Sequence, residues 1–259
     1  MEALLDGDLV AYRCSASANE ESTPDIAVSR AHELVERILT SVNADSFTVY
    51  LSGSNNFRKE INPQYKANRV QEKPKWLESV REFLITEWKA RVTDGYEADD
   101  ALGMAQTETS VICSLDKDLL MIPGKHYQWD ISGRTVKGEV WEKPASFYDI
   151  TKEEGLKRFW TQMIVGDKTD NIFGVAGLGP VKAEKALQGI TGDTLEELNT
   201  NYYDKVRSLY SDDLRLQSNA SCLWIMQHES DIWVDPQYAV DRSSRESIVA
   251  SLKQILLRP

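Results

Sequence analysis

"SVICSLDKD", Ser110 to Asp118, joins a short apolar run to two carboxylates, and this transition points to the fold class. The run Ser110 to Leu115 has the length and the polar boundaries of a buried β-strand. Two other runs share this character: Ala3 to Leu5, which stops at Asp6, and "FTVYL", Phe47 to Leu51. We therefore predict three buried strands, two of which end in acidic side chains.

Helical patterns lie between these strands. Pro24–Val42 and Pro74–Ala90 repeat apolar residues at helical spacing, and Pro24 suits the first turn of a helix. Alternating strands and helices favour a mainly parallel sheet flanked by helices, so the predicted fold class is α/β.

The second part of the chain is predicted to be helical. Within Gly124–Pro144, the pair "SG" between strand-like segments predicts a hairpin. Further helices are then expected at Lys152–Val165, Leu195–Leu209, Asp212–Gln227 and Arg245–Leu256. We place a boundary near residue 150, with an α/β region at 1–150 and a helical region at 151–259. The first region includes the segment 53–90, whose polar part, Gly53–Lys73, is long enough to be a mobile loop or arch.

Length and composition narrow the class of protein. The chain has 259 residues with 41% hydrophobic content, which is enough to bury a full core. No run approaches the roughly 20 apolar residues of a membrane span, and "MEALLDGDLV" lacks the basic start of a signal peptide. We expect a cytoplasmic protein without a membrane partner. The three cysteines have no C-x-x-C spacing, which argues against a disulfide framework and a zinc site.

The net charge of −11 argues, by itself, against a nucleic-acid partner. That argument weakens if many carboxylates gather around bound cations, because a local basic surface can then still hold phosphates.

The carboxylates are placed to gather in this way. Acids that follow parallel strands face one crevice at the carboxyl edge of the sheet. In "GYEADDALG", Gly95 to Gly103, Glu97 and Asp100 share a helix face, and "GDKTDN" adds another pair three residues apart. Each group alone also fits an ordinary helix start, turn or surface loop. The full candidate set is Asp6, Glu97, Asp99, Asp100, Asp116, Asp118, Asp167 and Asp170.

So many carboxylates in one place repel each other unless cations neutralise them. Hard oxygen ligands suit Mg²⁺ or Mn²⁺ better than zinc. Two such ions about 3.5–4 Å apart are the usual means of in-line phosphodiester hydrolysis. We therefore expect a two-metal site.

Two segments are candidates for holding phosphates. "FRKEINPQYKANR", Phe57 to Arg69, interleaves basic and aromatic residues, which suits phosphates and an unpaired base; a solvated helix face is the alternative. "GVAGLGPVKAEKAL", Gly174 to Leu187, places glycines before a helix start, where free amides can hold a phosphate; a helix–turn–helix corner is the alternative. The residues concerned are Arg58, Lys59, Tyr65, Lys66, Arg69, Gly174, Gly177, Gly179, Lys182 and Lys185.

The ordered motifs "LLDGD", "YKANR", "GYEADD", "SLDKDL" and "GDKTDNIFGVAGLGPVKAEKAL" resemble the 5′-nuclease family of flap endonucleases and 5′-3′ exonucleases. The match runs from residue 1 to about 190 and looks closest to the stand-alone bacteriophage exonucleases. The resemblance implies a nuclease core with a helical arch. It implies that the eight carboxylates hold the metals, that Lys66 and Arg69 contact the scissile phosphate, and that Tyr65 lies near the 5′ end.

The resemblance also implies a helix-hairpin-helix at 167–188, which grips duplex backbone, often around a monovalent cation such as K⁺. It departs at Gly53, where relatives commonly carry an aspartate, so one metal ligand is missing. The predicted function is a Mg²⁺-dependent 5′-3′ exonuclease or flap endonuclease that acts on DNA with a free 5′ end, flap or nick. RNA–DNA hybrids are a further expected substrate, and replication proteins are expected partners. A junction-binding protein that has lost cleavage is one alternative, and a single-strand ribonuclease is another.

Overall fold

The computed structural model describes residues 1–136 and 139–257 of the chain, which form two compact units. Unit 1 comprises Met1–Ser54, Glu72–Leu120 and Gly124–Ile150, and unit 2 comprises Asn55–Gln71, Met121–Pro123 and the chain from Thr151 onward. Both the structure and the sequence prediction divide the chain near residue 150. The structure groups Asn55–Gln71 with unit 2, however, whereas the sequence prediction includes this segment in the first region.

Unit 1 is built on a six-stranded sheet with the order β3-β2-β1-β4-β5-β8. The first five strands in the chain are parallel to their neighbours, and β8 runs antiparallel to β5 at the edge. The predicted α/β class and its three buried strands are confirmed. The strands are β1 (Glu2–Asp6), β2 (Ser46–Leu51), β3 (Arg91–Val92), β4 (Ser110–Cys113), β5 (Gly124–Gln128) and β8 (Ser146–Ile150).

The strand order reverses between β1 and β4. The chain adds β2 and β3 on one side of β1 and then adds β4 and β5 on the other side. In open α/β sheets, this reversal opens a crevice at the carboxyl ends of the strands. Leu5 of β1 pairs with Cys113 of β4, so Asp6 and Ser114, which come next, lie at the same level of this edge.

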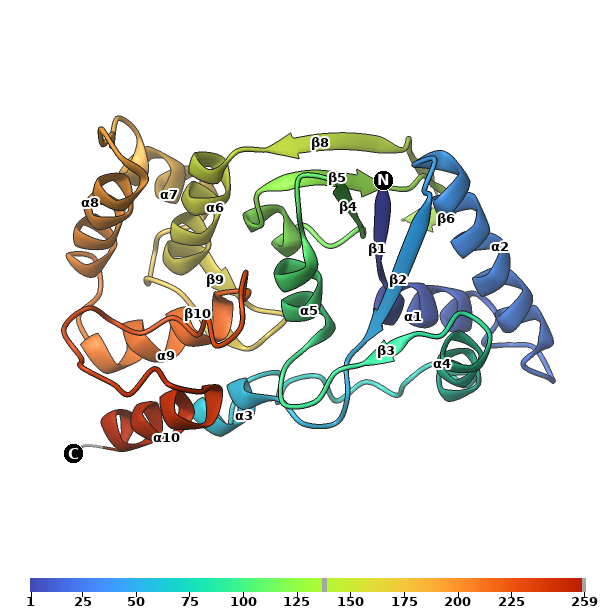
Figure 1. Cartoon of the computed structure of the whole chain (residues 1–259), viewed down its shortest axis with the longest axis horizontal. Coiled ribbons are helices and arrows are strands. Elements are labelled where there is room, and N and C mark those ends of the chain that lie inside the picture. Colours follow the sequence, from blue (N-terminus) through green and yellow to red (C-terminus); the bar gives the residue numbers. More distant parts are fainter. Residues whose placement is uncertain (137–138, 258–259) are drawn as a thin grey trace. The chain divides into compact units, whose positions relative to one another are not determined.

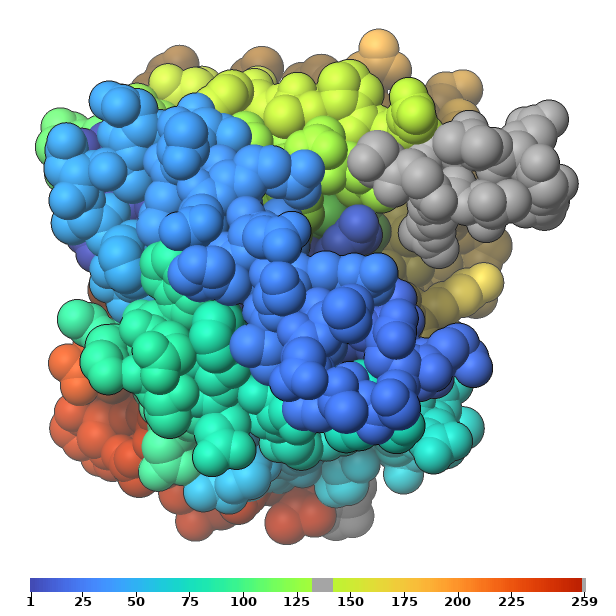
Figure 2. All heavy atoms as spheres, turned by 90° about the vertical axis from the view of Figure 1, so that its right-hand side faces the viewer, coloured from blue at the N-terminus to red at the C-terminus, as the bar shows by residue number. Residues whose placement is uncertain are grey.

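Helices pack on both faces of the sheet, as Figure 1 shows. The helices α1, α2 and α4 pack against one another on one face, and α5 lies against β1 and β2 on the other. Figure 2 looks onto the side of unit 1 where α2 and α4 lie. The bounds are α1 (Gly7–Ser17), α2 (Asp25–Ser41), α4 (Leu77–Thr86) and α5 (Ala98–Ala105).

The helix α1 is not among the elements predicted from the sequence. The pair Asp6-Gly7 resembles a turn signal, but the Asp6 carboxylate accepts a hydrogen bond from Leu9 N at 2.9 Å and caps the helix. Val10, Ala11 and Cys14 of α1 then enter the core beneath the sheet. The predicted helix Pro74–Ala90 is shorter in the structure, because Pro74–Trp76 precede it without helical structure.

A separate hairpin lies between β5 and β8 in the chain. The strands β6 (Ile131–Val136) and β7 (Glu139–Lys143) pair antiparallel, and the two residues between them lie outside the described ones. The predicted hairpin exists, but "SG" lies inside β6 at a register shift between Ile131 and Arg134, not at the turn. A Ser-Gly pair in a strand is compatible with such a bulge, which explains the wrong turn position.

Unit 2 is mostly helical and packs around aromatic side chains. Phe159 contacts Trp160 and Trp224 edge to face, and Trp233 contacts Trp160 in the same way. The first long helix begins where Thr151 and Glu154 form a capping box. The elements are α3 (Phe57–Ile61), α6 (Lys152–Val165), β9 (Gly166–Asp167), β10 (Ile172–Phe173), α7 (Pro180–Leu187), α8 (Leu195–Arg207), α9 (Asp213–Leu223) and α10 (Arg245–Leu256). Within the described residues, no helix has the length and apolar character needed to cross a membrane.

Candidate active site

Asp6 and the segment after β4 meet through Ser114. Ser114 Oγ donates a hydrogen bond to Asp6 Oδ2 at 2.7 Å. Ser114 Oγ also accepts a hydrogen bond from Asp116 N at 2.9 Å. Asp116 Oδ1 in turn accepts from Asp118 N at 2.8 Å, which closes a turn. The sequence prediction that acids after β1 and β4 face one edge is therefore supported for Asp6 and Asp116.

Asp6 is buried in surroundings that disfavour its ionised form. Its side chain is 4% exposed. Burial, together with the charges of Asp8 and Asp116, raises the pKa of Asp6 to about 7, although hydrogen bonds from Ser114 and Leu9 N oppose the shift. A cation bound beside these carboxylates would stabilise the ionised form of Asp6. Lys117, which points outward between the two acids of the turn, forms an ion pair with Asp118 at 3.0 Å.

The start of α5 is tied to the same edge of the sheet. Ala98 N donates to Ser52 Oγ at 2.9 Å, and Ser52 directly follows β2. Glu97 is the N-cap, and its backbone N–H donates to Asp100 Oδ2 at 3.0 Å. Asp100 is fully buried and Asp99 is half-buried. The predicted helix start is therefore present, and its acids serve both as caps and as candidate ligands.

We call the acids of unit 1 at this edge the carboxylate edge: Asp6, Asp8, Glu97, Asp99, Asp100, Asp116 and Asp118. The set contains only carboxylates, which suit a hard divalent cation, and Asp6 in particular carries charge that burial penalises. Among the residues that the structure describes, no three acidic, histidine or cysteine side chains converge closely enough to hold an ion. The carboxylate edge therefore has the right chemistry for a divalent cation but is not a closed coordination cage.

Two residues of this region were missed from the sequence. Asp8 Oδ2 accepts from Ser52 N at 2.9 Å, and its Oδ1 accepts from Arg81 Nη1 at 2.5 Å. Arg81 also donates to the Ser52 carbonyl at 2.6 Å, so α1, α4 and the end of β2 are held together. In the sequence, only the proximity of Asp8 to Asp6 in "DGD" hints at this role.

In unit 2, Asp170 lies at the centre of a cluster of basic and aromatic residues. Its carboxylate accepts from Arg69 Nη2 at 2.5 Å and from Tyr65 Oη at 3.0 Å, and Lys66 Nζ lies 3.7 Å away. We call Tyr65, Lys66, Arg69 and Asp170 the Asp170 cluster. The sequence prediction was that Lys66 and Arg69 contact a phosphate and that Asp170 binds a metal. In the structure, both cations pair with Asp170. Asp167 Oδ1 caps the adjacent turn by accepting from Thr169 N at 2.7 Å.

Two predicted nucleic-acid contacts in this segment are corrected by the structure. Arg58 is 2% exposed, and its guanidinium donates to the backbone carbonyls of Cys222 and Trp224 at 2.9 and 2.6 Å. Tyr65 is 3% exposed, which removes its ring face from base stacking. Both side chains support the packing of unit 2. Lys59, in contrast, is exposed.

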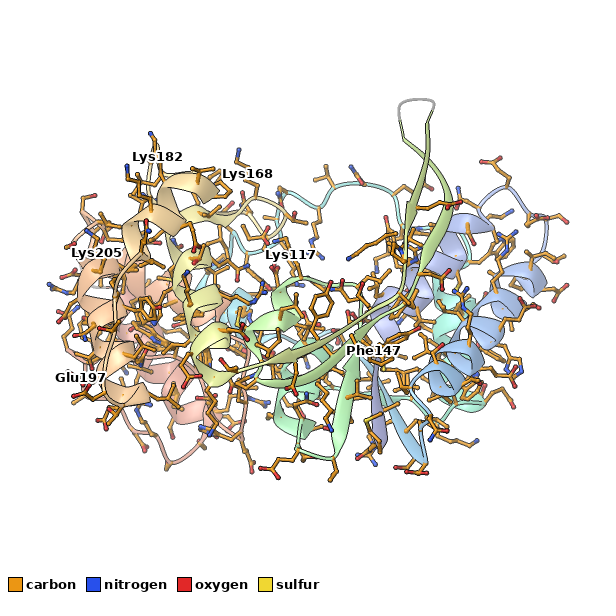
Figure 3. All side chains as sticks on the ribbon, turned by 90° about the horizontal axis from the view of Figure 1, so that it is seen from above. Lys117, Phe147, Lys168, Lys182, Glu197 and Lys205 are labelled. Atoms are coloured by element: carbon orange, nitrogen blue, oxygen red, sulfur yellow. The ribbon has the colours of Figure 1, made fainter. Side chains whose placement is uncertain are left out.

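The glycine-rich segment contains two kinds of glycine. At Gly177 and Gly179, an added Cβ would meet nothing within 4 Å, so a ligand can approach the backbone there. At Gly174, a Cβ would lie 2.2 Å from the Ile164 carbonyl, so this glycine serves close packing and not the predicted ligand approach. Lys182 Nζ donates to the Gly177 carbonyl at 2.9 Å, and Lys182 and Lys168 project outward from the ribbon (Figure 3). Lys185 is exposed on α7.

Gly53 follows β2 at the position where the resemblance leads us to expect an aspartate. A Cβ at Gly53 would lie 2.1 Å from the Thr93 carbonyl oxygen. A side chain therefore does not fit there unless the backbone moves. The absence of a carboxylate at this position therefore follows from the local packing of the backbone around Gly53.

Comparison with known proteins agrees with the motifs. A family model described as "5'-3' exonuclease, N-terminal resolvase-like domain" matches residues 2–145. A 5'-3' exonuclease of Mycoplasma genitalium is 25% identical over 232 residues, which cover 77% of this chain and 75% of that protein. DNA polymerase I of Bacillus caldotenax is 26% identical, and the match covers 97% of this chain but 31% of the polymerase. The chain thus spans about a third of the polymerase it matches.

Solved structures show the same fold. A T5 5'-exonuclease with bound divalent metal ions (zinc) aligns with a TM-score of 0.58 and 16% identity, covering 99% of this chain and 98% of that chain. A bacteriophage T5 flap endonuclease in complex with DNA and metal ions aligns with a TM-score of 0.58 and the same identity of 16%. The mainly parallel sheet flanked by helices is therefore shared with nucleases.

Proposed function

The chain belongs to the 5′-3′ exonuclease family defined by the N-terminal resolvase-like domain, and from this membership we propose that it is a divalent-metal-dependent 5′ nuclease. Its proposed reaction is the hydrolysis of phosphodiester bonds at 5′ ends of duplex or flapped DNA. The observation that supports the proposal most is the bridge from the Asp6 carboxylate through Ser114 Oγ to the Asp116 backbone N–H, because it holds Asp6 and the acidic turn after β4 together across the strand-order reversal.

The carboxylate edge would hold Mg²⁺ or Mn²⁺, with Asp6 and Asp116 as its central members. Two bound ions supply positive charge that stabilises the attacking and leaving oxygens of an in-line displacement. The protein positions the carboxylates: Ser114 holds Asp6, and the capped start of α5 holds Glu97 and Asp100. Asp167 and Asp170 of unit 2 are also proposed as metal ligands.

Lys66 and Arg69 are proposed to bind the scissile phosphate. A guanidinium pairs with two phosphate oxygens, and an ammonium adds a point charge. Both cations now pair with Asp170, so substrate binding would exchange that carboxylate for phosphate. In this proposal, the Asp170 cluster keeps the cations ordered before DNA arrives.

The segment 167–188 is proposed to act as a helix-hairpin-helix that grips duplex backbone. The open space at Gly177 and Gly179 and the exposed Lys182 support this role, and K⁺ is the proposed monovalent cation. Backbone contacts position a duplex without reading its sequence. RNA paired to DNA is a proposed second substrate, replication proteins are proposed partners, and the cytoplasm is the proposed location.

One observation favours a second candidate, a DNA-junction-binding protein that does not cleave. The Thr93 carbonyl oxygen lies where it would meet the Cβ of any side chain at Gly53, including that of an aspartate. A chain with this many other acids can bind metals without that ligand, so cleavage remains our first proposal.

The test is incubation of the purified protein with 5′-labelled blunt, nicked and flapped duplexes in Mg²⁺, in Mn²⁺ and in EDTA. We expect short 5′ products that need the metal. Asp116→Asn should abolish them, whereas Asp149→Asn, the same change at an exposed position of the edge strand β8, should not. Intact duplex binding without products in any metal would refute cleavage and leave junction binding.

The hairpin role has its own test. Lys182→Glu should weaken duplex binding and reduce its dependence on salt, since one phosphate contact is lost. Lys125→Glu, at an exposed position of β5, is the matched control. An unchanged salt slope in Lys182→Glu would remove this segment from the DNA interface.

A further inference from the structure

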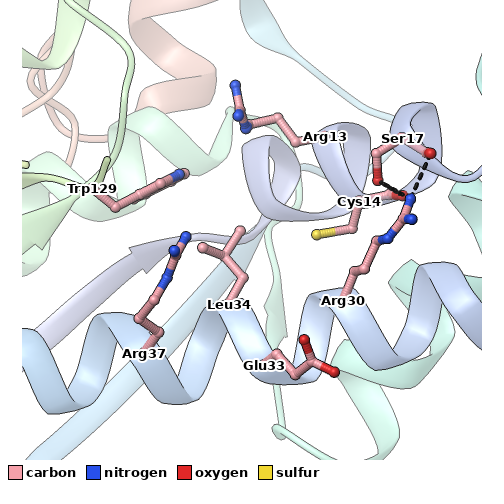
Figure 4. A pocket seen from close by; sticks show the side chains of 8 residues that line it. All are labelled: Arg13, Cys14, Ser17, Arg30, Glu33, Leu34, Arg37 and Trp129. Carbon is pink, nitrogen blue, oxygen red and sulfur yellow. Dashed lines mark hydrogen bonds between the residues drawn. The ribbon is translucent and has the colours of Figure 1, made fainter. Parts of the chain in front are cut away.

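Unit 1 contains a cavity of about 300 Å³ that belongs neither to the carboxylate edge nor to the Asp170 cluster. It lies between α1 and α2 and is closed on one side by Trp129, which follows β5 (Figure 4). Its lining includes Arg13 from α1 and Arg30 and Arg37 from α2. This concentration of guanidinium groups is unusual in a chain whose net charge is −11.

The positive charge of the cavity exceeds its negative charge. Its three lining arginines face one lining carboxylate, that of Glu33. Burial raises the pKa of the Cys14 thiol to about 11, and the charges of Arg13, Arg30 and Arg37 all act in the opposite direction. The fields of the three guanidinium groups therefore converge on the same small volume.

Two of the arginines, Arg30 and Arg37, are oriented by partners that a stronger anion could supplement or replace. Arg30 Nη1 donates to the carbonyl and the hydroxyl of Ser17 at 2.5 and 2.9 Å, which fixes its direction (Figure 4). Arg37 lies 3.2 Å from Asp130, and both side chains of that pair are more than a third exposed. An exposed ion pair of this kind is weak and can be exchanged for a better anion.

Trp129 provides a second, independent indication of a ligand. Its side chain is 1% exposed, and its indole N–H has no hydrogen-bond acceptor in the described part of the chain. The nitrogen faces the space that Arg13 and Arg37 border (Figure 4). A buried donor without an acceptor is costly, so a ligand oxygen in the cavity would satisfy it.

We propose that this cavity binds the phosphate monoester group of a nucleotide. Several guanidinium groups and one neutral N–H donor match the oxygens of a phosphate dianion, and arginine pairs with phosphate in bidentate geometry. The volume is at the lower end for small-ligand pockets, which fits a mononucleotide or a single phosphorylated strand end.

The nucleotide assignment rests on the proposed nuclease function, whereas the phosphate assignment does not. Arg13 lies seven residues beyond Asp6 on α1, or roughly 10 Å along the helix axis. A phosphate at this distance from the carboxylate edge would come from the 5′ end of a bound strand or from a released mononucleotide. Both sources present the same chemical group.

The first test is isothermal titration calorimetry of the full chain, dialysed free of metal, with thymidine 5′-monophosphate, inorganic phosphate and thymidine. We expect one site for each of the two phosphates and no binding of thymidine. Arg37→Gln and Arg30→Gln should each weaken binding about tenfold, and Trp129→Phe, which removes the N–H together with part of the indole ring, should weaken it severalfold. Arg158→Gln, at an exposed position of α6, is the control with the same charge change.

The proposal is overturned if neither phosphate compound binds, or if binding is equal in the native protein, Arg37→Gln and Arg30→Gln. Arg37 lies on the helix surface in a half-exposed pair, so its variant should fold even if Arg30→Gln does not. Circular dichroism of each variant checks the fold.

A second titration separates the two sources with 5′-phosphorylated and 5′-hydroxyl duplexes. A preference for the phosphorylated end that disappears in Arg37→Gln identifies the strand end as the ligand. Binding of the free mononucleotide without such a preference identifies the released product. Both results support the phosphate site, and phosphate binding without cleavage of any labelled duplex would refute the nuclease function alone.

Discussion

Ser114 Oγ donates a hydrogen bond to Asp6 Oδ2, with the two atoms 2.7 Å apart, and also accepts one from Asp116 N at 2.9 Å. One hydroxyl therefore connects the ends of β1 and β4 at the point where the strand order reverses. Because Ser114 holds Asp6 without belonging to the set of candidate ligands, we treat it as a positioning residue.

The change Ser114→Ala should weaken both stability and metal use. It leaves the buried Asp6 carboxylate without this donor, so the free energy of unfolding should fall by about 1–3 kcal/mol. Misplaced ligands should lower cleavage and Mg²⁺ affinity about tenfold. Urea unfolding and a Mg²⁺ titration of cleavage measure the two effects, and Ser114→Thr should restore part of both. Lost stability with an unchanged Mg²⁺ requirement would show that Ser114 serves packing alone.

Asp6 predicts a pH dependence that reverses when metal is added. Burial chiefly, and then the charges of Asp8 and Asp116, raise the pKa of Asp6 to about 7 from 3.8. A carboxyl with a raised folded-state pKa stabilises the fold below its unfolded pKa, and this stability is lost as the pH rises through the folded value. The metal-free protein should therefore lose stability between about pH 4 and pH 7, and Asp6→Asn should lose less over the same interval.

A divalent cation needs the ionised form of Asp6, so Mg²⁺ should stabilise the protein more as the pH rises through about 7. The measurement is the unfolding temperature with and without Mg²⁺ across this range, for the native protein and for Asp6→Asn. A Mg²⁺ effect of equal size at every pH would argue against Asp6 as a ligand.

The contacts of Asp170 predict that its substitution affects DNA binding and DNA cleavage in opposite directions. Its carboxylate pairs with Arg69 at 2.5 Å and lies 3.7 Å from Lys66. The change Asp170→Asn removes the charge that competes with phosphate, so duplex binding in Ca²⁺ should tighten severalfold while cleavage in Mg²⁺ falls. Arg69→Gln should weaken binding in the same assay. Weaker binding by Asp170→Asn would instead indicate that the order which the carboxylate gives the two cations matters more for DNA binding than its competition with phosphate.

The parts of the fold that the sequence predicts are those encoded by local periodicity. The β-type runs at Ala3–Leu5, Phe47–Leu51 and Ser110–Leu115 and the helix Lys152–Val165 all exist, and the rule for strand ends placed Asp6 correctly. The helix α1 was not predicted, because the pair Asp6-Gly7 resembles a turn signal although Asp6 is in fact the N-cap of the helix.

The errors concern residues whose role depends on distant partners. Arg58 looks like a surface cation in "FRKE", but its acceptors lie at Cys222 and Trp224, more than 160 positions away in the sequence. Ser114 has its partner 108 positions away. No local sequence pattern indicates such distant contacts. Arg58 was therefore predicted to contact DNA although it is a buried structural residue, and the positioning role of Ser114 was not predicted.

Arg58 should therefore affect stability and not the electrostatics of DNA binding. Arg58→Met leaves the carbonyls of Cys222 and Trp224 without their donor, so the free energy of unfolding should fall by about 2–4 kcal/mol. The salt slope of duplex binding by the folded fraction should stay unchanged. Lys59→Met, the neighbouring exposed position, should show the opposite pattern, with native stability and a slope reduced by about one. A reduced slope for Arg58→Met would place Arg58 on the DNA after all.

Gly53 tests whether the missing carboxylate can be restored. A Cβ at this position would lie 2.1 Å from the Thr93 carbonyl oxygen, a distance at which the backbone must move. Gly53→Asp should therefore lower the unfolding temperature without lowering the Mg²⁺ concentration needed for cleavage. Gly53→Ala separates the causes, because it adds the same Cβ without charge and should destabilise the protein by a similar amount. If Gly53→Asp instead cleaves at lower Mg²⁺ while Gly53→Ala does not, the edge accepts a further ligand, and the close approach of Thr93 does not prevent it.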